Sequence, residues 1–172
     1  MKREERTGIR MIVAILIVAS ILGPGVAGSQ SHRAKGNIAH RTRVVFVCEH
    51  GAALSVVSAA YFNKLAQQRH LDLHAVARGT TPQKDLAVSA REGLERDGIT
   101  FDGKRPQALS QEDLAGAILI VAFTPIPSRF SQTTPVETWS DVPPTGANYD
   151  LAREAILRHV RELISRMTPA NK

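Results

Sequence analysis

The feature that most constrains the fold of this chain is the stretch 44–55, where a strand pattern changes abruptly into a helical one. Residues 44–47 are β-branched or aromatic, which is typical of a buried parallel strand. After a break at residues 48–51, apolar residues recur at helical spacing: Ala53, Val56, Val57, Ala60, Tyr61 and Leu65. Cys48, the only cysteine of the chain, therefore lies where a strand ends and a loop leads into a helix N-terminus.

Such a junction favours an anion, because the first backbone N–H groups of a helix have no helical acceptor and the positive end of the helix dipole adds to them. A thiol in this environment is expected to ionise more readily than a free thiol. The residues alone therefore predict a binding site around Cys48.

Strand and helix patterns alternate along the rest of the chain. We expect further strands at 71–77, 117–123 and 136–139, and helices that end near residues 68–70, begin near Leu86 and span 149–167. Ser110 and Asp113 form a capping-box pattern on a short helical turn. Alternating strands and helices predict a parallel sheet that is covered on both sides, with ligands at the carboxyl ends of its strands. The outer face of the last helix carries arginines that we expect to be solvated: Arg153, Arg158, Arg161 and Arg166.

The N-terminus has the three parts of a secretory signal peptide. Basic residues precede the apolar run 11–22, and small residues lead to a plausible cleavage point after Gly28. We therefore expect residues 1–28 to be removed and the protein to be exported, to the periplasm or outside the cell. The alternative is an uncleaved membrane anchor, for which the run is only marginally long. The remaining organisation is a flexible leader at 29–42, one α/β domain at 43–168 and a tail at 169–172.

The net charge of +6 and the isoelectric point near 10.0 overstate the case for nucleic acid. Loss of residues 1–28 would remove four basic and two acidic residues and lower the net charge to about +4. No dense block of lysine and arginine then remains, and aromatic residues are few. We expect no nucleic acid partner, no cofactor and, if the N-terminal segment is cleaved, no membrane contact.

The stretch around Cys48 resembles the low-molecular-weight phosphotyrosine phosphatases and the related thioredoxin-coupled arsenate reductases. In that family a strand ends in Cys, five residues follow, and Arg and Ser close a loop that wraps phosphate or arsenate. Cys48 and Ser55 match the Cys and the Ser, and Gly51 takes a position that suits a left-handed backbone. The resemblance implies a nucleophile position at Cys48 and an anion-binding loop made of Glu49, His50, Gly51, Ala52, Ala53, Leu54 and Ser55.

Weaker similarities extend over the domain in the same order as in the family. Residues 77–82 resemble its Ser-Ala-Gly-Thr turn, and residues 98–114 resemble the stretch before its third strand. Trp139 and Pro144 match a loop of the arsenate-reductase side. The resemblance implies a three-layer α/β sandwich with a four-stranded parallel sheet and the cysteine-bearing strand inside it.

Two residues depart from the family at the positions that carry its chemistry. The family's arginine clamps the oxygens of the transferred group, and an aspartate before a proline protonates the leaving group. Leu54 occupies the arginine position and Pro143 the aspartate position, and neither side chain can perform the role. Asp141 is a candidate displaced acid, and Arg78, at the end of a neighbouring strand, is a candidate cation.

Three hypotheses follow. The first is an exported pseudoenzyme of the phosphatase fold that binds an oxyanion, a phosphorylated ligand or a protein partner without efficient turnover. The second is a divergent cysteine phosphatase with rescued catalysis. The third is a single-cysteine redox or metal-handling protein, with Cys48 and His50 joined by His70 or His74. Metal sites usually offer more ligands at tighter spacing, so we expect no metal. Thioredoxin-coupled arsenate reduction needs two further cysteines, which this chain lacks.

Overall fold

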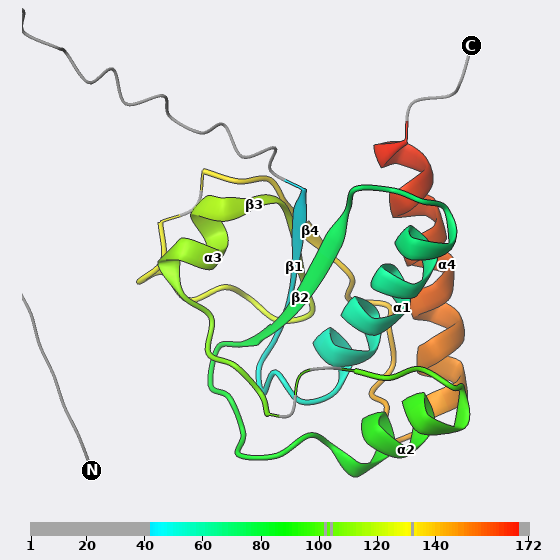
Figure 1. The fold of residues 1–172 in the computed structure, drawn as a ribbon. Helices are drawn as coiled ribbons and strands as arrows, with labels where there is room; N and C mark the ends of the chain where they lie inside the picture. Colours follow the sequence, from blue (N-terminus) through cyan, green and yellow to red (C-terminus); the bar gives the residue numbers. More distant parts are fainter. Residues whose placement is uncertain (1–41, 102, 104, 132, 169–172) are drawn as a thin grey trace, which may run out of the picture. The chain divides into compact units, whose positions relative to one another are not determined.

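The structure is a computed structural model that describes residues 42–101, 103, 105–131 and 133–168. The predicted signal peptide or anchor, the leader up to residue 41 and the tail lie outside the described residues. Four parallel strands form the sheet in the order β2-β1-β3-β4: β1 Arg43–Cys48, β2 His74–Gly79, β3 Ala117–Ala122 and β4 Val136–Thr138. Figure 1 shows the strand β1 in cyan between β2 and the β3–β4 pair. The predicted four-stranded parallel sheet with the cysteine-bearing strand inside is confirmed.

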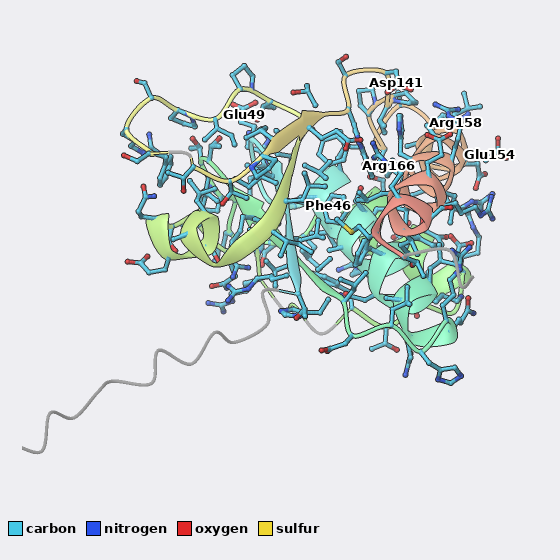
Figure 2. All side chains as sticks on the ribbon, turned by 90° about the horizontal axis from the view of Figure 1, so that it is seen from above. Phe46, Glu49, Asp141, Glu154, Arg158 and Arg166 are labelled. Atoms are coloured by element: carbon cyan, nitrogen blue, oxygen red, sulfur yellow. The ribbon has the colours of Figure 1, made fainter. Side chains whose placement is uncertain are left out.

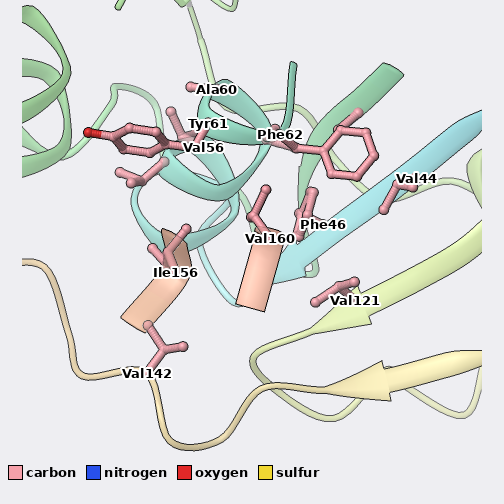
Figure 3. Packing of buried hydrophobic residues seen from close by; sticks show 14 of the residues in the cluster. Val44, Phe46, Val56, Ala60, Tyr61, Phe62, Val121, Val142, Ile156 and Val160 are labelled. Carbon is pink, nitrogen blue, oxygen red and sulfur yellow. The ribbon is translucent and has the colours of Figure 1, made fainter. Parts of the chain in front are cut away.

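The helices cover both faces of the sheet: α1 Leu54–Gln68, α2 Val88–Arg96, α3 Gln111–Gly116 and α4 Tyr149–Met167. Strand β1 shows why three layers form, because its side chains alternate between two apolar clusters. Val44 and Phe46 belong to the larger cluster with α1 and α4, whereas Val45 and Val47 belong to the smaller cluster with α3. Figure 3 shows Phe46 beside Phe62 of α1, and their ring centroids are 6.0 Å apart.

Strand β2 begins and ends later than the predicted strand 71–77. Residues 71–73 are instead a connection, because His70 adopts a left-handed φ of 54° and the N–H of Leu71 bonds back to the carbonyl of Ala66. At the other end, Gly79 belongs to the strand rather than to a turn. Its N–H and carbonyl bond to Gln107 and Leu109, which gives the strand a second partner.

The predicted capping box is confirmed, since the Ser110 side chain accepts from the N–H of Asp113 and the Asp113 side chain accepts in return. Helix α4 also has its predicted bounds. Its arginines, however, are not simply solvated. Arg153 donates to Asp97 at 3.2 Å with its side chain 25% exposed, so this part of the prediction is wrong.

Asp97 ties three helices together from the C-terminal end of α2. Its carboxylate accepts from the Tyr61 hydroxyl of α1 at 2.6 Å and from the Tyr149 hydroxyl of α4 at 2.9 Å. Burial alone would raise the pKa of Asp97, but the two phenols and Arg153 more than offset it, and the pKa lies below its ordinary value. Burial and the carboxylate raise the pKa of both phenols, that of Tyr149 to about 12. We refer to Asp97, Tyr61, Tyr149 and Arg153 as the Asp97 cluster.

Candidate functional site

The loop between β1 and α1 has a backbone that requires glycine at one position. Gly51 has a φ of +61°, and a Cβ atom there would lie 2.7 Å from the backbone nitrogen of Gly79. A left-handed residue in such close contact with a neighbouring strand excludes a side chain. The predicted left-handed position of Gly51 is confirmed.

Several carbonyl groups of this loop accept hydrogen bonds from the segment that follows β2. Four of them accept hydrogen bonds from segment 80–87 at N–O distances of 2.8–3.1 Å: those of Cys48, Glu49, His50 and Ala52. Within the part of the chain that the structure describes, no N–H group of residues 49–55 donates to a protein acceptor. Buried or half-buried N–H groups without acceptors are rare, and a bound anion satisfies them well.

Cys48 ends β1 with its side chain on the α1 side of the sheet, and it is 7% exposed. Its Sγ lies 3.1 Å from the Oγ of Ser55, which is fully buried in the first turn of α1. The nucleophile position and the serine hydroxyl are therefore in contact.

A cavity of about 510 Å³ opens above Cys48. Residues from four segments line it: Cys48, Glu49, His50, Ala52, Ala53 and Leu54 of the loop, Gln83, Ala87 and Ser89 of the α2 side, Phe123 and Thr124 after β3, and Pro144, Thr145 and Gly146. Among these described lining residues there is no lysine or arginine, and Glu49 carries the only carboxyl group. The cavity therefore combines backbone donors with a lining that holds no permanent positive charge.

The chain matches the family described as low molecular weight phosphotyrosine protein phosphatase over residues 43–131. That match spans half of the chain and includes β1, the Cys48 loop and α1. The chain belongs to this family.

Solved structures agree in fold. YfkJ from Bacillus subtilis is 22% identical, with a TM-score of 0.66 over 76% of this chain and 96% of that one. A low-molecular-weight protein tyrosine phosphatase from T. tengcongensis is 23% identical, with a TM-score of 0.63 over 73% and 99%. An arsenate reductase from Archaeoglobus fulgidus is 22% identical, with a TM-score of 0.57 over 71% and 98%. Among curated proteins, none matches the chain.

Arg78, the candidate replacement cation of this family member, does not line the cavity. It pairs with Val47 in the sheet register, so its side chain lies on the α3 face, whereas Cys48 is one residue further along and points to the opposite face. Its Nε donates to Asp113 at 2.7 Å. Burial would raise the pKa of Asp113, but the bond and charge of Arg78 hold it below its ordinary value. Arg78 is therefore committed to an ion pair away from the loop.

Asp141, the candidate displaced acid, does not line the cavity either. Its carboxylate accepts from His159 at 2.8 Å and from Arg158 at 2.7 Å, both on α4. Figure 2 shows Asp141 beside Arg158 and apart from Glu49. The hydrogen bond from His159 lowers the pKa of Asp141, which favours the ionised form and opposes proton donation. Neither candidate for a rescue, Arg78 or Asp141, therefore lines the cavity.

The loop that contains Trp139 and Pro144 reaches the cavity. Trp139 is buried and stacks on His159 with ring centroids 4.7 Å apart, which fixes the start of the loop against α4. Pro144 and its two successors line the cavity, and the Thr145 hydroxyl accepts from Ser89 of α2 at 3.1 Å. Pro143, at the position of the family's aspartate, is not among the lining residues.

The sequence interpretation missed the neutral polar residues of the far wall: Gln83, Ser89, Thr124 and Thr145. Thr124 had a signal, because it follows β3 at the carboxyl end of the sheet, where ligands of such folds bind. Ser89 and Thr145 had none, since only the packing of α2 against the last loop brings them to the cavity.

A metal site that joins Cys48 and His50 to His74 is not formed. His74 opposes Arg43 at the start of β1, whereas Cys48 opposes Gly79, about 16 Å further along the strands. Within the described residues, no three histidine, cysteine or carboxylate side chains are grouped to hold a metal ion. In the same part of the chain, no helix is long and apolar enough to cross a membrane.

Proposed function

We propose that this domain binds an oxyanion, free or carried on a phosphorylated ligand or partner, in the Cys48 loop and turns it over poorly. One observation carries the proposal: the N–H groups of residues 49–55 have no acceptor among the described residues, and the loop lines a cavity whose described lining holds neither an arginine nor a lysine. Backbone donors suffice to hold an anion in place. Hydrolysis requires more, because charge grows on the equatorial oxygens and on the leaving group in the transition state.

The expected catalytic loss is large. Removal of one preorganised donor to a transition state typically costs about 10²–10³-fold in rate. In this chain Leu54 stands where the family has an arginine that makes two hydrogen bonds to the anion. Pro143 stands where the family has the aspartate that acts as the acid. Asp141 and Arg78 are held by α4 and by Asp113, so neither is available to replace them.

A specific observation supports a second candidate, a divergent cysteine phosphatase that uses Glu49 as its acid. Glu49 carries the only carboxyl group among the lining residues and is adjacent to Cys48. Its side chain is 63% exposed and lies 3.7 Å from His50. This candidate lacks a charge clamp in the same way as the first.

Turnover and binding measured on one set of variants separate the two candidates. Aryl phosphate hydrolysis by the purified domain, with Cys48→Ala as the blank, is expected to be near background, and Leu54→Arg is expected to increase it. Alkylation of Cys48 by neutral iodoacetamide, with and without phosphate, reports binding. Protection without turnover supports the first candidate. Turnover at ordinary enzyme rates that Cys48→Ala and Glu49→Gln both abolish supports the second.

We also propose that the protein is exported and cleaved near Gly28, on the strength of the basic, apolar and small-residue segments of the N-terminus. Mass spectrometry of the native protein from fractionated cells tests this directly. An intact N-terminal segment in a soluble cytoplasmic fraction would contradict export, and an intact segment in the membrane fraction would indicate an anchor.

A further inference from the structure

We propose that the Cys48 cavity selects singly charged tetrahedral oxyanions over doubly charged ones of the same size. This inference rests on the proposed function, since it requires that the loop binds an oxyanion at all. A phosphate monoester carries close to two negative charges at neutral pH, so the inferred preference is for anions of lower charge than such a monoester. The preference follows from the balance of charges around the loop.

The positive side of that balance is small. The N–H groups of the loop and the N-terminus of α1 supply partial charges, and a helix N-terminus is equivalent to about half an elementary charge. These contributions can compensate one negative charge in part. A second negative charge on the anion has no cation to meet it, because Leu54 stands at the loop's arginine position and Arg78 faces the other side of the sheet.

The negative contribution to the charge balance comes from a carboxylate of the cavity lining. Glu49 lines the cavity and no other lining residue carries a permanent charge. A like charge within several ångströms disfavours each added negative charge, and the cost for a dianion is twice that for a monoanion. His50, 3.7 Å from Glu49, is the only lining side chain that can become positively charged.

The polar side chains of the far wall are uncharged. The Oγ1 atom of Thr124 is buried and has no hydrogen-bond partner among the described residues, although Thr124 lines the cavity. The Ser89 hydroxyl donates to Thr145, which leaves the proton of the Thr145 hydroxyl as a neutral donor at the cavity. Neutral donors suit an anion of low charge.

Perrhenate and tungstate test the proposal, because they are tetrahedral oxyanions of nearly equal size that carry one and two negative charges. Each is titrated against the alkylation of Cys48 by iodoacetamide in the full mature chain. We expect perrhenate to protect at a concentration at least about tenfold lower than tungstate, which is the size of effect that one nearby like charge has on an ionisation equilibrium.

Three variants make the test independent of general salt effects. Leu54→Arg restores a cation and is expected to reverse the preference. Glu49→Gln removes the like charge and is expected to reduce the preference for perrhenate over tungstate. His50→Gln removes the compensating base and is expected to leave that preference unchanged or to increase it. Circular dichroism of each variant verifies the fold.

Each outcome decides a different claim. Preference for perrhenate that Leu54→Arg reverses supports the inference. Equal protection, or stronger protection by tungstate in the wild type, overturns the inference and leaves the proposed function standing. Absence of protection by either anion overturns both, and a perrhenate effect that persists unchanged in Leu54→Arg is a salt effect that overturns the inference.

Discussion

The Asp97 cluster and the Cys48 cavity are both polar places in an apolar protein, but they differ in how their polar groups are satisfied. Every member of the Asp97 cluster has a partner at 2.6–3.2 Å within the chain. At the Cys48 cavity, the loop N–H groups and the Thr124 hydroxyl have none among the described residues. A network in which every polar group has a partner stabilises and rigidifies a fold. Donors beside a cavity that lack a protein acceptor can instead bind a ligand. The Asp97 cluster therefore stabilises the fold, whereas the Cys48 cavity keeps donors without a described protein partner.

The largest effect is expected at Gly51, where one substitution should reduce both the stability of the fold and the binding of an anion by the loop. Gly51→Ala must accommodate both a left-handed φ and a Cβ atom 2.7 Å from the Gly79 backbone. We expect a loss of about 2–4 kcal/mol in the free energy of unfolding, together with loss of anion protection at Cys48. Urea denaturation and iodoacetamide kinetics measure the two.

Gly98→Ala is the matched control for Gly51. Gly98 has nearly the same φ, +62°, but a Cβ atom added there would meet no other atom within 4 Å, so only the backbone strain of about 1 kcal/mol applies. Cys48 should remain protected in this variant. Equal losses for the two variants would mean that the approach of Gly51 to Gly79 is unimportant.

Breaking the Asp97 cluster should cost stability and leave the cavity intact. Asp97→Ala is expected to lower the free energy of unfolding by about 2–3 kcal/mol, less than for a fully buried charge because the Asp97 side chain is 16% exposed. Glu92→Ala, in an exposed pair with Arg91, should change it by less than about 0.5 kcal/mol. Loss of anion protection in folded Asp97→Ala would contradict the separation of the two regions.

Acid should act on the Asp97 cluster and on the ion pair of Asp113 with Arg78. The pKa values of Asp97 and Asp113 are lower in the folded chain than in the unfolded one, so their stabilisation is present above the unfolded value near 4 and is lost as the pH falls through the folded values. The free energy of unfolding should therefore fall steeply below pH 4. Asp97→Asn should make the free energy of unfolding fall less steeply below pH 4. An unchanged pH profile in this variant would show that Asp97 does not contribute to the loss of stability in acid.

The smallest effect is expected at Asp141, which the sequence suggested as an acid. Its side chain is 51% exposed and its partners lie on α4, so Asp141→Asn should change stability by less than about 0.5 kcal/mol. Residual aryl phosphate turnover should not change either. A fall in turnover without a fall in stability would restore Asp141 as a catalytic candidate.

The sequence predicted the sheet, the helices and the Cys48 loop well because their signals are local. The strand run before Cys48, the capping box at Ser110 and the apolar face of α4 each depend on neighbouring residues only. The rest depends on register. In the register of β1 and β2, Arg78 lies opposite Val47 and not opposite Cys48. Because successive side chains alternate between the two faces, this difference of one residue puts Arg78 on the other face of the sheet. Ser89 and Thr145 meet only through packing between α2 and a distant loop.

The most direct test of anion binding by the loop is a ¹H–¹⁵N correlation spectrum of the mature domain as perrhenate, and separately tungstate, is added. The central claim is that the backbone N–H groups of residues 49–55 are the anion donors. We expect the amide signals of Gly51, Ala52 and Ala53 to shift saturably with at least one of the anions, while the amide of Asp97 stays still. Signals that shift elsewhere but not in this loop, or that do not shift at all, would contradict the claim that the loop binds oxyanions.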